Sequence, residues 1–549
     1  MKKTWWKEAI CYQVYPRSFK DSNGDGIGDI KGVIQKLDYL NDLGIDVIWL
    51  SPIYESPNDD NGYDISDYKK ILDDFGTMSD FDELLEQAHS RNMKIIMDLV
   101  VNHTSDEHEW FIESKKGSDN PYHDWYIWEK PKSDGSEPNN WASIFEGSAW
   151  EYEESIDKYY MHLFSKKQPD LNWENKDMRE AIYEMINWWL DKGIDGFRVD
   201  AISHIKKSFD KGDLKPKLDE KYVSSFSAHM NQEGIHKHLN ELKEKTLSNY
   251  DIMTVGEANG VTIDDASDWV GEKDGKFNMV FQFEHLNLWD YNSNEDFDVL
   301  GYKKVLNKWQ TGLNGIGWNA LFIENHDKPR IPSTWGSEDF WYESSTSHGM
   351  IYFFQKGTPF IYQGQEIGMT NYPFTKIEEF NDVHARNIYD KDLASGINEN
   401  IIINKLKQQS RDNSRTPMQW NNKENAGFSD NRPWLNVNPN YEKINVENQL
   451  NDENSILNFY KKMIELKKSN DTLIYGDFEL LLKEDEAVFA YTRSLNEEKY
   501  LVIANLTDSK KEISLIKQEY KLILGNYSNH KTNSINELNE YECRLYKIV

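Results

Sequence analysis

The chain has 549 residues, and 94 Asp and Glu against 63 Lys and Arg give it a formal net charge of -31. Nucleic acids and anionic membranes repel so acidic a chain, and we expect neither as a partner. Its length exceeds that of one hydrophobic core and predicts roughly two to four domains. A share of 13% aromatic residues excludes a disordered chain.

Cys11 and Cys543 are the only two cysteines of the sequence, too few for a disulfide framework or a thiolate metal site. Residues 1–6 carry two lysines without a following apolar core, so we expect no signal peptide. No stretch approaches the roughly 18 apolar residues of a membrane span. These features predict a cytoplasmic protein.

The first hundred residues alternate short apolar runs with helical patterns. Three runs are typical of buried strands: residues 10–16, 47–50 and 94–100. An apolar stripe over 33–43 predicts a helix that ends at Gly44, and Ser79 with Asp82 predicts the capped start of a second helix. Nearly continuous apolar strands that alternate with helices indicate a parallel sheet covered on both faces.

Residues 104–174 interrupt this alternation. They are rich in Trp, Asp, Ser, Asn and Pro and lack a helical period, which predicts an inserted subdomain because a structureless loop of this length is improbable. A helical pattern returns over 182–190. It leads through Gly193-Ile194-Asp195 into an apolar run at 196–200, as Gly44-Ile45-Asp46 leads into the second strand. The two similar junctions indicate a repeated βα unit.

The second half of the chain continues the pattern. Further strands are predicted at 252–257, 279–283, 320–324 and 359–362. Eight strands in a chain of this length favour a closed barrel over an open sheet. Residues 373–450 then read as a polar insertion after the eighth strand, and an amphipathic helix over 455–468 is expected to close the barrel.

After Asn470 short alternating runs at 487–491 and 500–504 predict antiparallel strands. The predicted fold is therefore of the α/β class, a (β/α)8 TIM barrel with an inserted subdomain after strand 3 and a C-terminal antiparallel β-domain. The predicted domains are the barrel (1–103 and 175–470), the inserted subdomain (104–174) and a β-sandwich-like domain (471–549).

Polar and charged residues recur where the predicted strands end. They are Asp98, Asn102, His103, Arg198, Asp200, Glu257, Asn325, His326 and Asp327. In a parallel barrel all these ends converge on one face, where active sites are built. One such residue alone could belong to a structural ion pair, but the whole set indicates an active site.

Two opposed carboxylates with hydrogen-bond donors around them suit glycoside hydrolysis. Arg198 and Asp200 lie two apart on a strand and share a face, so the guanidinium should keep Asp200 ionised as a nucleophile. Glu257 follows apolar residues that should favour its protonated form, as a general acid requires. Asp327 would bind sugar hydroxyl groups more strongly as the ring flattens toward the oxocarbenium state.

Four segments, 98–103, 196–200, Glu257 and 325–327, resemble the four sequence regions of the α-amylase superfamily, glycoside hydrolase family 13. Three more are similar to its oligo-1,6-glucosidase/α-glucosidase subgroup: 60–65, 168–172 and 410–420. That subgroup contains oligo-1,6-glucosidases, α-1,4-glucosidases, dextran glucosidases, trehalose-6-phosphate hydrolases and sucrose isomerases.

The resemblance implies that Asp200 is the nucleophile, Glu257 the acid/base and Asp327 the transition-state stabiliser, with no cofactor for catalysis. It implies a pocket for the terminal glucose lined by Asp60, Tyr63, His103, Arg198, His326 and Arg411. Asp60 and Arg411 would hold the 4-hydroxyl group, which makes the pocket blind and the enzyme exo-acting. Arg415 is the alternative arginine.

An Asx-rich loop follows the first predicted strand. Its start matches the D-x-[DN]-x-[DN]-G calcium pattern, but Gly32 stands where the bidentate glutamate belongs, and an ordinary turn is the alternative. The resemblance favours a structural Ca²⁺ or Mg²⁺ ion on Asp21, Asn23, Asp25, Ile27 and Asp29.

Ala201 departs from the subgroup pattern, in which α-1,6-specific enzymes typically carry Val and α-1,4-specific ones Thr. The smaller Ala predicts relaxed linkage preference, unless it is a neutral packing choice. Residues 284–290 lack the arginine-rich stretch of sucrose isomerases, although 256–260 and 438–441 look isomerase-like.

We therefore expect a retaining exo-α-glucosidase on terminal α-1,6 bonds of short oligosaccharides, with activity on α-1,4 bonds and on sucrose left open. A sucrose isomerase or transglucosylase is the first alternative. The second is a non-catalytic carbohydrate-binding or transporter-accessory barrel. Such relatives lack the catalytic carboxylates, which this chain retains.

Overall fold

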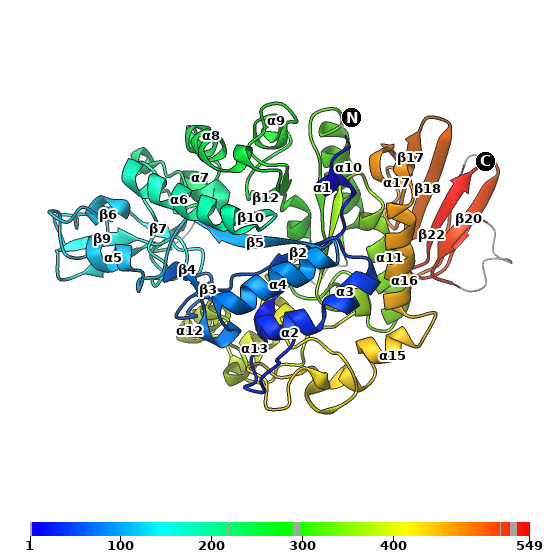
Figure 1. Ribbon diagram of the computed structural model, residues 1–549, viewed down its shortest axis with the longest axis horizontal. Helices are drawn as coiled ribbons and strands as arrows, with labels where there is room; N and C mark the ends of the chain where they lie inside the picture. The colour runs from blue at the N-terminus through cyan, green and yellow to red at the C-terminus, as the bar shows by residue number, and fades with distance from the viewer. Residues whose placement is uncertain (1–2, 217–219, 289–296, 516–517, 528–534) are drawn as a thin grey trace.

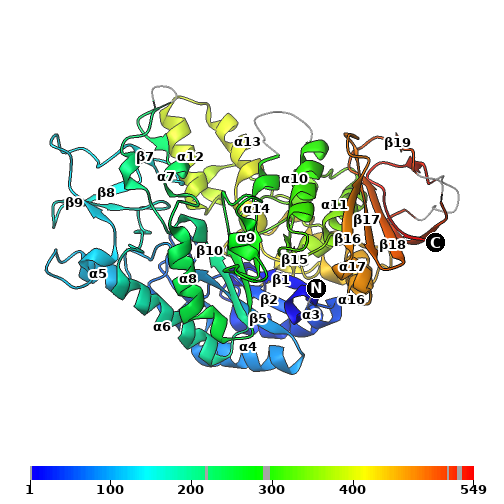
Figure 2. The ribbon, with the colours of Figure 1, turned by 90° about the horizontal axis from the view of Figure 1, so that it is seen from above.

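The computed structural model describes residues 3–216, 220–288, 297–515, 518–527 and 535–549. A central sheet surrounded by helices lies between a small subdomain at one end of the molecule and a C-terminal sheet at the other (Figures 1 and 2). The central sheet has eight parallel strands in the order β13-β12-β10-β5-β2-β1-β15-β14. They are β1 (Cys11–Val14), β2 (Val47–Leu50), β5 (Lys94–Val100), β10 (Gly196–Asp200), β12 (Met253–Glu257), β13 (Met279–Phe281), β14 (Ala320–Leu321) and β15 (Thr358–Tyr362).

This order confirms the predicted barrel class, because consecutive strands of the sheet pair, except β13 with β14, and β1 pairs with β15. The strands β13 and β14 are the two ends of the hydrogen-bonded order. They are shorter than the predicted runs 279–283 and 320–324.

The first helices correct two predictions. The pattern at 33–43 forms two helices, α2 (Ile30–Gln35) and α3 (Leu37–Leu43), and α3 ends at Gly44 with φ of 94°. The helix α4 (Met78–Ser90) is capped by Thr77 with Asp80, so the predicted cap at Ser79 with Asp82 is wrong. Thr77 has extended backbone angles that allow its hydroxyl group to accept from the Asp80 N–H, whereas Ser79 already lies in the first turn.

The two similar junctions predicted before β2 and β10 have the same structure. Asp46 Oδ2 accepts a hydrogen bond from the N–H of Ile10, and Asp195 Oδ2 accepts one from the N–H of Ile95, both at 2.9 Å. The glycine two residues earlier has a left-handed φ of 94° or 105° that ends the preceding helix. Asn278 accepts in the same way from the N–H of Thr254 at 2.7 Å. These side chains fix the amino-terminal ends of the strands.

Helices cover the outside of the sheet, as Figure 1 shows. Besides α4, they include α6 (Lys176–Lys192), α8 (Ile235–Lys245), α10 (Val299–Gly312), α11 (Trp341–Phe353) and α16 (Ile456–Lys468). The helix α16 confirms the pattern at 455–468, with Ser455 as its N-cap. Its Lys468 pairs with Asp46 at 2.6 Å and ties the last barrel helix to the junction before β2.

The segment after β5 forms the small subdomain. It contains α5 (Glu109–Ser114) and an antiparallel sheet of β6 (Trp128–Glu129), β9 (Lys158–Met161) and β8 (Trp150–Glu153). Its β7 (Trp141–Ala142) pairs with β11 (Val223–Ser224), which follows β10 in the chain. A second segment thus adds to this subdomain, which the sequence did not predict. The domain boundaries at 103, 174 and 470 stay predictions.

The insertion after β15 is largely helical rather than a plain polar loop. It contains α12 (Val383–Ala394), α13 (Glu399–Gln409) and the short α14 (Asp412–Arg415). A side chain of α12 bonds the subdomain, because Asn387 Nδ2 donates to the carbonyl of Phe145 at 2.9 Å. The insertion and the subdomain therefore meet above the barrel (Figure 2).

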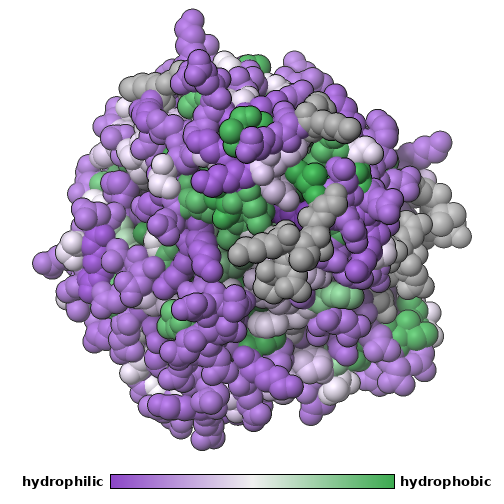
Figure 3. Space-filling view, turned by 90° about the vertical axis from the view of Figure 1, so that its right-hand side faces the viewer, coloured by the Kyte–Doolittle hydropathy of each residue, from purple (hydrophilic) through white to green (hydrophobic). Residues whose placement is uncertain are grey.

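The C-terminal sheet is antiparallel and confirms the strands predicted at 487–491 and 500–504. Its order is β16 (Asp477–Leu481), β17 (Val488–Leu495), β18 (Glu498–Asn505), β22 (Cys543–Ile548) and β20 (Tyr520–Gly525). The molecular face on this side is mostly hydrophilic with small separate hydrophobic areas (Figure 3). Within the described ranges, no helix is long and apolar enough to cross a membrane.

Candidate active site

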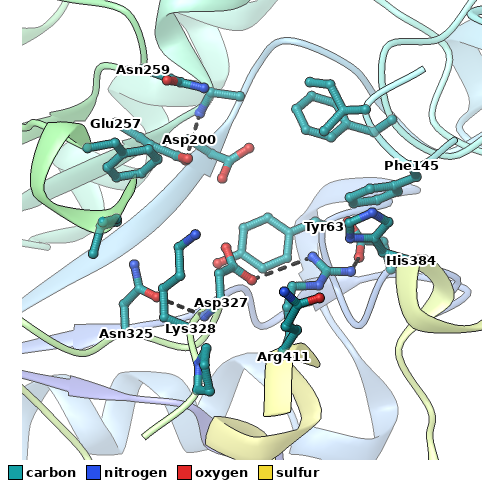
Figure 4. A pocket seen from close by; sticks show the side chains of 18 of the residues that line it. Tyr63, Phe145, Asp200, Glu257, Asn259, Asn325, Asp327, Lys328, His384 and Arg411 are labelled. Atoms are coloured by element: carbon teal, nitrogen blue, oxygen red, sulfur yellow. Dashed lines mark hydrogen bonds and ion pairs between the residues drawn. The ribbon is translucent and has the colours of Figure 1, made fainter. Parts of the chain in front are cut away.

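A cavity of about 440 Å³ lies at the carboxyl ends of the barrel strands. Side chains from three parts of the fold face it in Figure 4: strand ends, the subdomain and the insertion after β15. It brings together seven residues predicted for the site: Asp60, Tyr63, His103, Asp200, Glu257, Asp327 and Arg411. The other two, Arg198 and His326, lie buried behind these and contact them.

Arg198 contacts three carboxylates from three neighbouring strands. Its Nη1 atom lies 2.8 Å from Asp98 Oδ1 and 2.6 Å from Asp200 Oδ1, and its Nη2 atom lies 2.5 Å from Glu257 Oε2. The strand β10 pairs with both β5 and β12, which places the three carboxylates around one guanidinium group. The predicted contact between Arg198 and Asp200 is therefore present, and the sharing of this guanidinium group with Asp98 and Glu257 was not predicted.

This sharing changes the electrostatics of the pair Asp200 and Glu257. Burial raises the pKa of Asp200, the charges of Glu257 and Asp98 raise it further, and Arg198 opposes them. Burial likewise raises the pKa of Asp98 to about 6. One positive charge does not balance three negative ones in a buried cluster, so Asp98 and Asp200 take up a proton more readily than isolated aspartates do.

A chain of hydrogen bonds lies behind the cluster. His326 Nδ1 is 2.8 Å from Gln13 Nε2, His326 Nε2 is 2.6 Å from the Tyr63 hydroxyl oxygen, and that hydroxyl group donates to Asp98 at 3.0 Å. Burial lowers the pKa of His326 to about 3, so its ring is neutral. Because Gln13 occupies Nδ1 as a donor, the ring proton sits on Nε2 and faces Tyr63.

Asp327 is the third carboxylate of the cavity. Arg415 Nη2 lies 2.8 Å from its Oδ1 atom and Arg411 Nη1 lies 3.5 Å away. Burial would raise the pKa of Asp327, but the positive charges of Arg411 and Arg415 outweigh it and hold the pKa well below its usual range. Asp327 is therefore ionised at any working pH.

Arg411 also forms one end of the cavity. Its Nη2 atom lies 2.9 Å from Asp60 Oδ1 and 2.6 Å from Asp382 Oδ1, and its guanidinium group lies 4.8 Å from the centre of the Phe145 ring. Arg415 is fully buried and donates to the carbonyl of His326 at 3.0 Å. Arg411, and not Arg415, is thus the arginine in contact with Asp60.

The sequence did not predict Asp382, which is the N-cap of α12 and accepts from the N–H of His384. An Asp before a helical pattern was the available signal, but nothing in the sequence connects it to Arg411. Other lining residues missed by the sequence are Phe145, Asn259, Lys328 and His384. His384 stacks on Phe145 with 5.4 Å between ring centres.

His103 lies beside the Asp60 end of the cavity. Its Nε2 atom is 3.1 Å from Gln168 Nε2, and the same Gln168 amide donates to Asp60 at 3.2 Å. Burial lowers the pKa of His103 to about 4, so the ring is a neutral hydrogen-bonding group. Gln168 belongs to the segment 168–172 that resembles the subgroup pattern, and it joins the subdomain to the Asp60 end of the cavity.

The predicted metal loop lies elsewhere, since none of its five residues lines the cavity. Asp21 accepts from the N–H groups of Asn23, Gly24 and Gly26, and from the Ser429 hydroxyl group at 2.6 Å. Asp29 caps α2. The donor set of side-chain and backbone oxygens suits a hard cation such as Ca²⁺. Of the described residues, however, no three His, Cys, Asp or Glu gather as a metal site.

Comparison with family models agrees with this architecture. The α-amylase catalytic domain matches residues 13–476, and the α-amylase SusG C-terminal domain matches residues 488–539. The first match alone covers most of the chain and includes every residue that lines the cavity.

The chain is also similar to curated proteins along its whole length. It is 54% identical to the "probable oligo-1,6-glucosidase 3" of Bacillus subtilis, over 100% of both chains. It is 51% identical to the oligo-1,6-glucosidase of Halalkalibacterium halodurans, over 100% of this chain and 99% of the relative.

Two solved structures are similar over 100% of both chains. The trehalose-6-phosphate hydrolase of Bacillus licheniformis has a TM-score of 0.92 at 44% identity. The isomaltulose synthase of Klebsiella sp. LX3 has a TM-score of 0.94 at 39% identity. Enzymes of different specificity thus share this fold.

Proposed function

The chain belongs to the α-amylase family of glycoside hydrolases, and from this premise we propose that it is a retaining exo-acting α-glucosidase of the oligo-1,6-glucosidase type. The contact of Arg411 with Asp60, at the end of a cavity that also holds Asp200, Glu257 and Asp327, carries this proposal. This ion pair would close that end of the cavity, so that a single terminal glucose residue fits between the pair and the bond to be cut.

In the first step Asp200 attacks the anomeric carbon and forms a covalent glucosyl ester. Glu257 gives its proton to the glycosidic oxygen, and the aglycone leaves as an alcohol. In the second step Glu257 takes a proton from water, and the resulting hydroxide attacks the anomeric carbon. Glucose leaves with the original α configuration and Asp200 is ionised again. Both carboxylates contact one guanidinium group, which agrees with the short separation, about 5 Å, of retaining enzymes.

The shared Arg198 sets a condition for this chemistry. The proposed roles require that Glu257 carries a proton and that Asp200 is ionised when the glucoside binds. Arg198 contacts both carboxylates and can therefore stabilise the negative charge on whichever of the two is ionised. Asp327, which stays ionised, accepts hydrogen bonds from the ring hydroxyl groups and stabilises the positive charge of the oxocarbenium state.

We propose terminal α-1,6 bonds of short oligosaccharides as the main substrate, because both curated relatives reported above are named for that activity. The small Ala201, which lines the cavity, supports additional hydrolysis of α-1,4 bonds. The test is product analysis on isomaltose, isomaltotriose, maltose and sucrose, with the anomer of released glucose followed by NMR. Release of β-glucose, or of internal fragments from longer isomaltooligosaccharides, would overturn the proposal.

Sucrose isomerisation or glucosyl transfer is the second candidate, favoured by the similarity to isomaltulose synthase. The absence of arginine from 284–288 argues against it; Trp289 and Asp290 of that stretch lie outside the described residues. Isomaltulose formed from sucrose would identify this activity. A non-catalytic barrel is tested by Asp200→Asn, since only a catalytic role of Asp200 predicts loss of turnover by a factor of about 10⁴ or more.

For the Asx-rich loop we propose a structural Ca²⁺ ion, with Mg²⁺ as the alternative. Asp21, Asn23 and Asp25 would supply side-chain oxygens, Asp29 a carboxylate and Ile27 its carbonyl group. The ion would link the loop after β1 to Ser429, because Asp21 already bonds that residue. It would take no part in catalysis, since these residues do not line the cavity.

We further propose a cytoplasmic location and a small oligosaccharide as the only class of partner, without nucleic acid or membrane binding. The two cysteines are free and buried, as a reducing compartment allows. The net charge of -31 opposes binding to polyanions. Cell fractionation, and a gel-shift assay with DNA at low salt, test the two statements.

A further inference from the structure

A second cavity, of about 350 Å³, lies at the opposite end of the barrel. Its lining includes Thr254 at the start of β12 and Asn278 directly before β13, whereas Glu257 at the other end of β12 lines the catalytic cavity. The two cavities have no lining residue in common. Nothing in the proposed hydrolysis uses this second cavity.

Three lysines line it: Lys7, Lys243 and Lys276. Lys7 is 3% exposed and Lys276 is 7% exposed, which is unusual because a buried ammonium group is costly without a partner. The only carboxylate in the lining is Glu272. The lining thus holds three lysines and one glutamate, although the chain as a whole is strongly acidic.

Two of the lysines have partners in the protein. Lys7 Nζ lies 2.6 Å from Glu272 Oε1, and 5.2 Å from the ring centres of both Trp6 and Trp318. Lys243 Nζ donates to the carbonyl of Gly275 at 2.7 Å. That neutral partner leaves the charge of Lys243 without a counter-ion in the lining.

Lys276 has no such partner, for no hydrogen bond or ion pair of its ammonium group occurs within the described ranges. Burial lowers its pKa, and Lys243 lowers it further, while Asp268 and Asp274 act in the opposite direction from outside the lining. The hydroxyl group of Thr4, in the same lining, is buried and also lacks a partner. Among the described residues, the Lys276 ammonium group and the Thr4 hydroxyl group are therefore two hydrogen-bond donors of this lining without a partner.

The rest of the lining includes four aromatic residues, of which Phe277 and Trp318 are buried and Trp6 and Tyr250 are half-buried. Aromatic faces pack against the apolar faces of sugar rings, and the volume is in the range of small-molecule sites. We propose that this cavity binds a small phosphorylated sugar, with the phosphate group on Lys276 and Lys243 and the sugar ring against Trp6 and Tyr250. Phosphate would supply both the acceptor oxygens and the negative charge that these donors lack.

Titration of the full chain with glucose 6-phosphate, inorganic phosphate and glucose tests this site by calorimetry and thermal shift. We expect glucose 6-phosphate to bind and to raise Tm. Lys276→Met should weaken that binding at least about tenfold, the effect of losing one charge-assisted contact. Lys273→Met is the matched control, because Lys273 is exposed and outside the lining. It should bind as the wild type does.

Absence of binding, or equal affinity in Lys276→Met and the wild type, would overturn the proposal. Binding in the catalytic cavity would give that second result, since Lys276 does not line it. Inorganic phosphate that binds as tightly as glucose 6-phosphate would overturn the role of the sugar ring. Lys276→Arg keeps the charge and should retain binding, which separates loss of the charge from a general loss of folding.

Discussion

Asp382 and Arg411 form an ion pair of 2.6 Å that holds the guanidinium group against the end of the catalytic cavity. Asp382 begins α12 as its N-cap, so the start of a helix in the insertion after β15 sets the position of an arginine that also contacts Asp60. Both carboxylates are buried, and the pKa of Asp382 is about 2 because Arg411 outweighs the effect of burial. Asp382 therefore acts as a positioning residue for Arg411.

We predict that Asp382→Asn raises KM for isomaltose more than it lowers kcat. The neutral amide would still cap α12 but would hold Arg411 less firmly, and loss of a buried charged contact costs about 2 kcal/mol or more. That corresponds to a decrease of kcat/KM by a factor of about 30. Steady-state kinetics on isomaltose measures kcat and KM separately. Asp390→Asn, an exposed change on the same helix, is the control and should leave both constants unchanged. An equal response of the two variants would contradict the role of Asp382.

The contrast between Asp382 and Asp200 shows what the sequence could and could not predict. Asp200 ends a nearly continuous apolar run, and such runs predict buried parallel strands whose carboxyl ends meet on one face. Asp382 lies in a polar segment without period, and its contact with Arg411 spans 29 residues. Tertiary packing of two helices creates that contact, and no local pattern encodes it.

The same distinction applies to Arg198. Its spacing to Asp200 is local, and it predicts the contact that the structure contains. Its contacts with Asp98 and Glu257 depend on which strands flank β10, and a linear sequence does not state how many charges meet across a sheet. The predicted cap of α4 is wrong for a local reason. Thr77 with Asp80 and Ser79 with Asp82 have the same spacing, and only backbone angles distinguish the two pairs.

We predict that the acid limb of the kcat/KM profile lies well above the ordinary pKa of Asp, about 4. As the proposed nucleophile, Asp200 must be ionised to attack, and burial with the charges of Glu257 and Asp98 raises its pKa. Activity is therefore lost as the pH falls through this raised value. Asp98→Asn removes one of these charges and should move the acid limb to lower pH. A profile that does not move would show that Asp98 is uncoupled from the nucleophile, and Tm measured alongside reports whether the fold is retained.

Removal of the proposed metal ion should destabilise the loop of residues 21–29 without changing the rate of hydrolysis. We expect excess chelator to lower Tm by several degrees and Ca²⁺ to restore it, because an ion that binds only the folded state stabilises it by mass action. At a temperature far below Tm, kcat should stay the same, since the loop does not line the catalytic cavity. Asp25→Asn should weaken the response to Ca²⁺. A Tm unaffected by chelator and by Ca²⁺ would leave the loop as an ordinary turn.

Lys303 of α10 should stabilise the attachment of the C-terminal sheet. Its buried ammonium group donates to three carbonyl groups, those of Leu482, Asp485 and Val488, at 2.5 to 2.9 Å. Lys303→Met leaves all three without this donor and should cost about 3 kcal/mol of unfolding free energy. The exposed Lys304→Met is the control. Denaturant unfolding measures this cost, and equal free energies of unfolding for the two variants would contradict the prediction.

Ala201 offers the sharpest test of linkage preference. Its N–H donates to Glu257 Oε2 at 3.1 Å and its methyl group lines the cavity, so a larger side chain narrows the space beside the acid/base. An α-1,6 bond contains an additional CH2 group that carries the aglycone away from this wall, whereas an α-1,4 bond does not. Ala201→Val should therefore lower kcat/KM for maltose more than for isomaltose.

The backbone of Ala201 sets the cost of that change. Its φ of 43° is left-handed, a conformation that branched side chains adopt with strain of about 1 kcal/mol or more. Ala201→Val should thus lower Tm as well as change the preference, while Ala201→Gly should relieve strain and keep the preference of the wild type. Competition between isomaltose and maltose measures the ratio of kcat/KM directly. If the valine variant keeps the wild-type ratio, the small residue at this position is a packing choice and linkage preference is determined elsewhere in the cavity.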